Sequence, residues 1–185
     1  MNAETQAPSI TRILLLGGGF AGIYTARRLE KLFAGRSDVE IILVSRDNFL
    51  LMTPLMFEVC SGTLEPSDCS ISIREFLRNV KFVEASVDEI DLERRIVRIS
   101  PGDAHKRVLP YDQLVLAMGS LTDTSRIPGS EFAFTFKTLA DAILLRNHLI
   151  ERMERAEAES DPMLRRRDLT FVVIGGGLVG VEVFG

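Results

Sequence analysis

The stretch Ile13-Leu14-Leu15-Leu16-Gly17-Gly18-Gly19-Phe20-Ala21-Gly22 decides the first half of the fold. An apolar run leads into the pattern Gly-x-Gly-x-x-Gly, which is typical of a parallel strand that turns into a helix and receives a pyrophosphate. The same combination returns as Phe171-Val172-Val173-Ile174-Gly175-Gly176-Gly177-Leu178-Val179-Gly180. One such motif is weak evidence. Two of them predict a protein that holds two dinucleotides against each other and therefore carries out redox chemistry.

The glycines of the first turn each have an expected task. Gly17 allows the tight bend, Gly19 lets the backbone close on the pyrophosphate, and Gly22 lets the helix pack against the sheet. The phosphates would then face unpaired N–H groups at the positive end of a helix dipole. A turn that binds nothing is the alternative, but strand, turn and helix all fit nucleotide binding. The residues expected to bind this nucleotide are Gly17, Gly18, Gly19, Phe20, Ala21 and Gly22.

The second buried strand, expected at Val39–Ser45, lacks one element of the dinucleotide fingerprint. A carboxylate usually ends this strand and accepts from the ribose hydroxyls, but here the position holds Ser45. A serine makes one such bond, more weakly than an anion does. Asp47 is a candidate substitute. Arg46 either lies over the adenine, pairs with phosphate or points into water, and we interpret Ser45 and Arg46 as part of an adenosine site.

The order of apolar and polar runs predicts an α/β fold with a Rossmann-like parallel sheet. A strand at Ile10–Leu16, a helix at about Phe20–Ala34 and the strand at Val39–Ser45 make one βαβ unit. Alternating residues from Glu89 onward indicate an antiparallel β-meander that turns at Glu93-Arg94 and Pro101-Gly102. The other expected elements are a short helix at about Ile71–Asn79, strands at Val80–Val87 and Gln113–Ala117, and a helix at about Leu139–Ala158.

The chain is expected to hold one complete domain and part of another. Residues 8–122 form the first nucleotide-binding domain, and residues 123–185 a connecting helix and the start of the second. Arg46–Asp68 is expected to be a long apolar loop, and loops of this length in compact domains usually bind something. Because few residues follow the second turn, we expect the front part of a larger enzyme. Its exposed apolar edge should make the isolated chain prone to associate.

Composition excludes several classes of protein. The 185 residues are 46% hydrophobic and 26% charged, which is typical of a globular chain. A net charge of -4 gives no reason to expect a nucleic-acid partner, and Arg165–Arg167 is interpreted as a solvated loop before a strand. The polar N-terminus, Met1–Gln6, does not have the build of a signal peptide, and no apolar run has the length needed to cross a bilayer.

The two cysteines and two histidines carry little chemistry. Cys60 and Cys69 form neither a disulfide framework nor a metal cluster, which fits a reducing compartment. Their spacing is not that of a redox pair, so we interpret Cys60 as a buried thiol. His105 and His148 are isolated and are given no role.

In the second turn, Gly175, Gly177 and Gly180 are expected to have the same tasks as the corresponding glycines of the first turn. Glu182 follows two residues after the last glycine, on the first turn of the helix. The helix dipole alone favours a carboxylate there. The functional interpretation is that Glu182 faces a bound nicotinamide.

Stretches outside the glycine motifs carry a resemblance to a known family. The residues concerned are Leu16–Gly22, Arg46–Leu55, Gly62–Pro66, Leu109–Ser120, Leu144–Leu149 and Val173–Gly177. Together they resemble a type II NADH dehydrogenase, the single-subunit NADH:quinone oxidoreductase of the pyridine nucleotide-disulfide oxidoreductase superfamily. The resemblance covers nearly the whole chain, and its middle stretches are more specific than the glycine motifs, which many flavoproteins share.

The resemblance implies which nucleotide each turn binds. The first domain, residues 8–122, would bind FAD, and the second turn would bind NADH through Gly175, Gly177 and Gly180. Glu182 would lie beside the nicotinamide and flavin rings as a catalytic residue. The remaining flavin-binding positions are Thr53, Pro54, Val87, Ala117, Met118 and Gly119.

The resemblance also implies the reaction and its partners. In this family, hydride passes from NADH to the flavin and two electrons then pass to a quinone, without a metal or a cysteine pair. NADH and a quinone are the expected small-molecule partners, and a homodimer is left open. The chain is expected in the cytoplasm, with its parent enzyme peripheral on the cytoplasmic face of the inner membrane. Contact with the membrane surface would come only through C-terminal helices that this sequence lacks.

Departures from the family pattern leave alternatives open. Met118 stands where threonine or leucine is more usual, Leu178 and Val179 replace proline and threonine, and Phe184 replaces a small residue. One alternative is a related FAD-dependent NAD(P)H reductase with another acceptor, such as sulfide, a disulfide or a small protein. The other is a non-catalytic flavin-binding fragment.

Overall fold

A parallel four-stranded sheet forms the centre of the first of two units. The computed structural model describes residues 10–102, 105–125 and 127–185, so the polar N-terminus and the first residues of the expected domain lie outside the described part. One unit contains the residues up to Leu50 and Ile71–Gly119, and the other contains Leu51–Ser70 and Ser120–Gly185. The sheet has the order β5-β2-β1-β9 and is built from β1 (Thr11–Leu16), β2 (Val39–Ser45), β5 (Lys81–Glu84) and β9 (Gln113–Leu116).

The register of this sheet brings the carboxyl ends of the strands to one edge. Leu16, the last residue of β1, is paired with Val44 of β2 and with Leu116 of β9. Ser45, the last residue of β2, is paired with Glu84, the last residue of β5. The two central strands are almost wholly apolar and buried, as expected for a parallel sheet covered on both faces.

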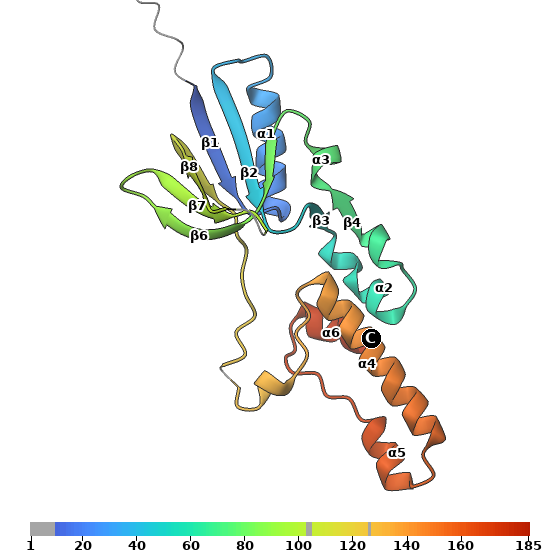
Figure 1. The fold of residues 1–185 in the computed structure, drawn as a ribbon. Helices are drawn as coiled ribbons and strands as arrows, with labels where there is room; N and C mark the ends of the chain where they lie inside the picture. Colours follow the sequence, from blue (N-terminus) through green and yellow to red (C-terminus); the bar gives the residue numbers. More distant parts are fainter. Residues whose placement is uncertain (1–9, 103–104, 126) are drawn as a thin grey trace, which may run out of the picture. The chain divides into compact units, whose positions relative to one another are not determined.

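A helix lies on one face of the sheet and an antiparallel meander on the other (Figure 1). The helix α1 (Phe20–Leu32) buries Ile23 and Ala26, whereas Tyr24 and Leu32 are exposed. The meander comprises β6 (Ser86–Asp91), β7 (Ile96–Ser100) and β8 (Arg107–Pro110). Its apolar side chains pack on the sheet in one cluster, which includes Leu14, Leu16, Val44, Val97 and Ile99. The predicted α/β fold with a parallel sheet and a β-meander is confirmed.

The segment Arg46–Asp68 is not the unstructured loop expected from the sequence. It contains β3 (Phe49–Leu51), a 3-10 helix at Thr53–Leu55, the helix α2 (Met56–Ser61) and the start of a second 3-10 helix at Pro66–Cys69. Met56 and Val59 of α2 pack with Cys69 and Ala142 in a small core of the second unit. The apolar residues that suggested a ligand-binding loop therefore form an α-helical packing core.

Two elements that follow this segment also differ from those expected from the sequence. The helix expected at Ile71–Asn79 is the short α3 (Ile73–Phe76), preceded by β4 (Ser70–Ser72), which pairs with β3. The strand expected at Val80–Val87 is divided, because β5 ends at Glu84 and the chain enters β6 at Ser86.

The long helix α4 (Leu139–Ala158) has the bounds that the sequence predicted and begins with a capping box. The Thr138 hydroxyl accepts from the Asp141 N–H at 3.2 Å, and an Asp141 carboxylate oxygen accepts from the N–H groups of Thr138 and Lys137, each at 2.8 Å. Burial raises the pKa of Asp141, but these hydrogen bonds outweigh it and hold the pKa below its usual value. Several apolar side chains of α4 are about half exposed, namely Leu144, Ile150 and Met153.

The basic run Arg165–Arg167 lies on a helix, which corrects the solvated loop expected there. Asp161 caps the N-terminus of α5 (Pro162–Asp168) by accepting from the Met163 N–H at 2.8 Å. Pro162 occupies the first helical position, where its missing N–H costs nothing. The three arginines fall in the last turn, where cations are favoured by the helix dipole.

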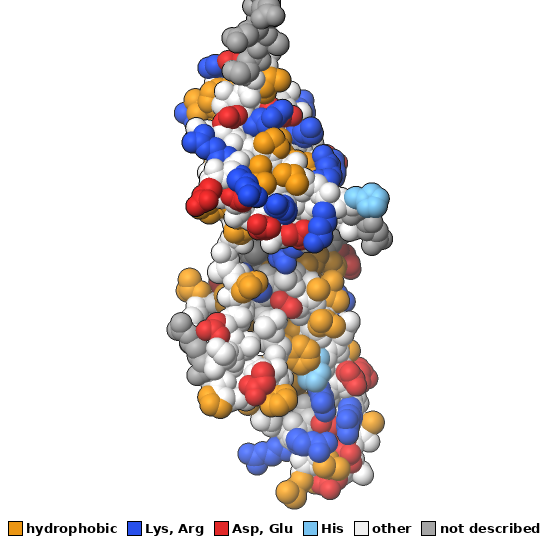
Figure 2. Space-filling view, turned by 60° about the vertical axis from the view of Figure 1, so that its left-hand side comes forward, with side chains coloured by type: hydrophobic (Ala, Val, Ile, Leu, Met, Phe, Trp, Pro, Cys, Tyr) orange, Lys and Arg blue, Asp and Glu red, His pale blue; other side chains and the backbone are white. Residues whose placement is uncertain are grey.

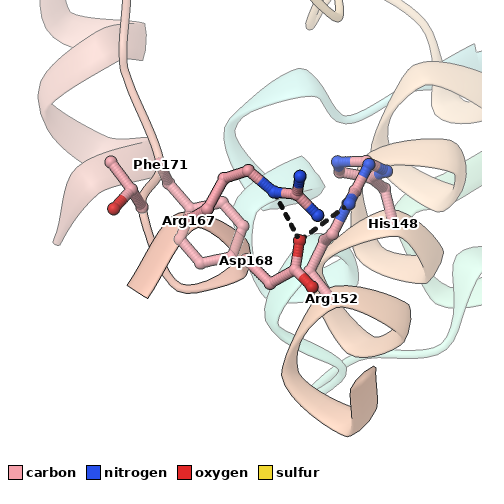
Figure 3. A pocket seen from close by; sticks show the side chains of 6 residues that line it. His148, Arg152, Arg167, Asp168 and Phe171 are labelled. Atoms are coloured by element: carbon pink, nitrogen blue, oxygen red, sulfur yellow. Dashed lines mark hydrogen bonds and ion pairs between the residues drawn. The ribbon is translucent and has the colours of Figure 1, made fainter. Parts of the chain in front are cut away.

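A buried carboxylate joins α5 to α4. The side chain of Asp168 is only 1% exposed, and Arg152 of α4 donates to its Oδ1 at 3.0 Å. Arg155 Nε lies 3.1 Å from Oδ2 and Arg167 Nε lies 3.6 Å from Oδ1. Figure 3 shows the guanidinium groups of Arg152 and Arg167 converging on the carboxylate. The burial of Asp168 is therefore compensated by cations from both helices.

The second glycine-rich segment has a helix but no strand. The residues Phe171–Ile174 form no strand, and their exposed fractions are 43%, 81%, 39% and 48%. The helix α6 (Leu178–Phe184) follows the turn. None of the helices in the described part of the chain is both long and apolar enough to cross a membrane.

Asp141→Asn is expected to destabilise α4 at neutral pH. The pKa of Asp141 is lowered in the folded state, so its charge contributes stability above the unfolded pKa of about 3.9, and this contribution disappears as the pH falls through the folded value. The cost at pH 7 should be about 0.5–1 kcal/mol, discounted because the side chain is only partly buried. Urea unfolding followed by circular dichroism at pH 7 and at about pH 3 measures this difference. Glu154→Gln, on an exposed face of the same helix, is the control, and a cost independent of pH would contradict the assignment.

Asp168→Asn is expected to loosen α5 from α4. The change removes the buried charge but keeps the side-chain shape, and the arginines are 35–60% exposed, so we expect a loss of about 1–2 kcal/mol. Hydrogen exchange of the α5 amides should accelerate accordingly. Glu157→Gln breaks only the exposed pair with Arg165 and should cost less than about 0.5 kcal/mol. Equal exchange rates in the two variants would show that Asp168 does not hold the helices together.

Candidate functional site

The candidate site lies where β1 turns into α1, at the carboxyl edge of the parallel sheet. Gly17 has a φ of +113°, which favours glycine, and its N–H donates to the Val44 carbonyl at 2.8 Å. Gly19 is the N-cap of α1, with extended backbone and no side chain to accept from the first helical N–H groups. Those N–H groups, at the positive end of the helix, are therefore available to an anion.

Three glycines of this turn have a packing reason visible in the protein itself. A Cβ on Gly17 would collide with the Ala117 carbonyl at the end of β9. A Cβ on Gly18 would come within 2.5 Å of Ser45 Oγ, and one on Gly22 would collide with the Gly17 carbonyl. The turn is thus held tightly between the ends of β9 and β2.

Gly19 is different, because among the described residues no atom beyond its own chain neighbours lies within 4 Å of the position its Cβ would occupy. Its φ of −79° is also open to any residue, so neither strain nor internal packing explains a glycine here. Open space at this point, beside unpaired helix N–H groups, fits the close approach of a pyrophosphate. The geometry of the turn therefore suits the FAD that the resemblance implies.

The turn is bordered by apolar side chains that face solvent. Ala117 continues β9 by donating its N–H to the Leu16 carbonyl at 2.8 Å, and Gly119 follows with a φ of +71°. Met118 is 57% exposed, and Phe20, at the start of α1, is 39% exposed. Exposed apolar groups beside a polar turn are a frequent feature of ligand sites.

Ser45 and Arg46 end β2 next to this turn. The side chains of Ser45 and Ile73 both lie close to Gly18, as the space around its Cβ position shows. A pocket of about 270 Å³ lies at the same edge of the sheet, and it is lined by Arg46, Glu84, Ala85, Ser86, Ser100 and Gly102. The structure therefore brings together the predicted residues Gly17–Gly22, Ser45, Ala117 and Met118. Arg46 directly follows Ser45, and Glu84 of β5, which sequence reasoning did not consider, is paired with Ser45 in the sheet.

The other predicted flavin-binding residues belong to other elements. Val87 is in β6, where its side chain packs against the core cluster of the first unit. Thr53 and Pro54 belong to the second unit, in the 3-10 helix Thr53–Leu55. The assignment of these three residues to the flavin site stays a prediction.

The second turn repeats the backbone of the first. Gly175 has a φ of +109°, and Gly177 is the N-cap of α6 with a φ of −73° and nothing within 4 Å of a Cβ. A Cβ on Gly180 would collide with the Gly175 carbonyl, as one on Gly22 would with Gly17. Glu182 lies on α6 and is exposed. Its role beside a nicotinamide stays a prediction.

The remaining candidates give no sign of catalytic chemistry. Burial raises the pKa of the Cys60 thiol, while the positive charge of Arg146 lowers it only in part, so the thiol form is favoured. The ring of His148 lies 4.7 Å from the ring of Phe134. Within the described residues, no group of three or more potential ligands could hold a metal ion.

A second pocket, of about 480 Å³, lies beside the Asp168 cluster in the second unit. Its lining residues are His148, Arg152, Arg167, Asp168, Thr170 and Phe171 (Figure 3). Both arginines already pair with Asp168, and the Thr170 hydroxyl donates to the Arg166 carbonyl at 2.6 Å. The polar groups here are engaged in holding α5, which indicates a structural role.

Charged side chains of both signs share the face seen in Figure 2. On the face seen in Figure 2, Lys and Arg side chains are interspersed with Asp and Glu. Such a mixed face does not have the single-sign character of a nucleic-acid interface.

Comparison with known proteins supports the resemblance drawn from the sequence. A type II NADH:quinone oxidoreductase, NdhA, of Mycobacterium tuberculosis is 38% identical over 94% of this chain, and a second from the same organism is 34% identical over 97%. The solved structure of NDH2 from Plasmodium falciparum, in complex with RYL-552, has a TM-score of 0.82 and 28% identity over 94% of this chain.

These matches use only part of each relative. The chain spans 37% and 38% of the length of the two mycobacterial proteins and 36% of the Plasmodium chain. The predicted resemblance to the N-terminal part of a type II NADH dehydrogenase is confirmed. A family model described as pyridine nucleotide-disulphide oxidoreductase matches residues 11–184, and the chain belongs to this family of oxidoreductases.

Proposed function

We propose that the first unit binds FAD at the β1–α1 turn and that the protein transfers electrons from NADH to a quinone. The observation that carries the proposal is the open space beside Gly19, next to the N-terminus of α1. In the first turn, this is the one glycine that internal packing and backbone strain do not explain. A pyrophosphate that lies against the backbone at this point explains why the residue is a glycine.

Each group at the site has a proposed task toward the flavin nucleotide. The N–H groups at the start of α1 bind the pyrophosphate, and Ser45 and Arg46 lie toward the adenosine. Met118 and Phe20 provide apolar surface beside the turn. Ala117 and Gly119 belong to the segment that follows β9 and passes the turn. Bound FAD supplies the two-electron chemistry between NADH and a quinone.

The electron donor and acceptor are inferred from the relatives. One Plasmodium NDH2 structure, with a TM-score of 0.80, is a complex with NADH, and the mycobacterial relatives are named as NADH:quinone oxidoreductases. The second turn has the same dihedral pattern as the first and is proposed to bind NADH through Gly175, Gly177 and Gly180. Glu182, on the helix that follows, is proposed to lie beside the nicotinamide.

The proposal extends to location and assembly. Quinones of membranes are lipid-soluble, so an enzyme that reduces them is proposed to work peripherally at a membrane surface. Self-association is proposed through the apolar side chains of the second unit, among which Val172, Leu178 and Phe184 are more than 80% exposed.

Gly19→Val is expected to abolish flavin binding while leaving the fold intact. The new side chain would fill the space proposed for the pyrophosphate, yet it meets no protein atom and the φ of −79° accepts it. The purified variant should show no flavin absorption and an unchanged circular dichroism spectrum. Gly176→Val, which also faces open space, is the matched control and should keep the flavin of the first site. Full flavin occupancy in the Gly19 variant would refute the assignment.

Anaerobic addition of NADH to the flavin-loaded chain tests electron transfer. If the first turn binds FAD and the second binds NADH in this chain, the flavin absorption bleaches with NADH and returns when a quinone is added. Flavin bands that do not bleach would support a flavin-binding unit without a working donor site. Bleaching that Cys60 alkylation abolishes would favour a reductase with a thiol-dependent acceptor instead.

A further inference from the structure

Two polar residues end neighbouring strands at the edge where the first nucleotide is proposed to bind. In the parallel pair β2–β5, Ser45 is in register with Glu84, and each is the last residue of its strand. Neighbouring strands lie about 4.8 Å apart, so the two side chains begin within reach of one ligand group. The carboxylate absent from the end of β2 thus has a counterpart one strand away.

Both side chains point to the same face of the sheet. The preceding pair, Val44 and Val83, packs in the cluster under the meander. Because side chains alternate along a strand, Ser45 and Glu84 lie on the opposite face. That is the face of the glycine turn, since Ser45 Oγ lies beside Gly18.

The polar groups at this edge are not used elsewhere in the protein. Over the described ranges, the side chains of Ser45, Arg46 and Glu84 form no hydrogen bond or ion pair with another residue. Glu84 is exposed and therefore accessible to a ligand.

We propose that Glu84 supplies the carboxylate that accepts hydrogen bonds from the adenosine ribose hydroxyls, in place of the acid missing at Ser45. This inference rests on the proposed binding of FAD by the first turn. Glu84 starts from the edge strand β5 and reaches the ribose from the side. Ser45 then supplies a single hydroxyl, and Arg46 remains available to the adenine or a phosphate.

The alternative is that Glu84 is a solvated side chain that contacts no ligand. Ligands with and without the adenosine ribose hydroxyls distinguish these two interpretations. We would measure dissociation constants for FAD, FMN, ADP and 2′,3′-dideoxy-ADP on the full 185-residue chain and on Glu84→Gln. Loss of a charge-assisted hydrogen bond should weaken FAD and ADP about tenfold or more. The binding of FMN, which has no adenosine, should not change. Wild type should prefer ADP to its dideoxy analogue, and the variant should lose this preference.

Two further variants complete the test. Glu93→Gln removes the same charge in the exposed turn between β6 and β7 and should bind all four ligands like wild type. Ser45→Glu in the Glu84→Gln background should restore the preference for ADP, because it returns a carboxylate to the end of β2. If Glu84→Gln keeps the preference for ADP, the inference is overturned and the FAD site stands. If wild type binds neither FAD nor ADP, the proposed function fails and the inference fails with it.

Discussion

The close approach of the Gly17–Gly22 backbone to the ends of two neighbouring strands is the constraint on which the first unit depends. Gly17 lies so near the Ala117 carbonyl, and Gly18 so near Ser45, that any side chain would separate the turn from β9 or β2. The same approach brings Gly22 against the Gly17 carbonyl and so seats α1 on the sheet. One steric requirement therefore sets the strand ends, the start of the helix and the empty space beside Gly19.

The chemistry proposed for the site follows from where this constraint leaves polar groups. Unpaired N–H groups lie at the start of α1, and the polar residues Ser45, Arg46 and Glu84 lie at the ends of β2 and β5. The second turn has the same backbone conformation, but the residues before it, Phe171–Ile174, are not in a sheet. The glycine pattern thus sets the local turn, while a complete nucleotide site also requires neighbouring strands that present their ends to it.

Local patterns predicted the elements that local physics controls. The bounds of β2 agree with the prediction to the residue, because a continuous apolar run marks a buried parallel strand. Those of α4 agree with the approximate range predicted. Prediction failed where the partner of an apolar residue is distant in sequence. The apolar residues of Arg46–Asp68 suggested a ligand-lining loop, yet Met56 and Val59 within this segment belong to α2 and pack with Ala142 of α4. Arg165–Arg167 suggested a loop because the buried partner Asp168 could not be recognised before α4 and α5 were placed together.

The sequence by itself determined the glycine turn, the α/β class and the family, since all three depend on residue types at fixed spacing along the chain. It also showed that the usual acid is missing at Ser45. Only the tertiary structure decided which residue stands beside that gap. The pairing of Ser45 with Glu84 is a matter of strand order and register, and residues 39 positions apart become neighbours only when β5 joins the edge of the sheet. The burial of Asp168 among arginines of two helices was decided in the same way, because burial depends on packing between elements and not on the local sequence.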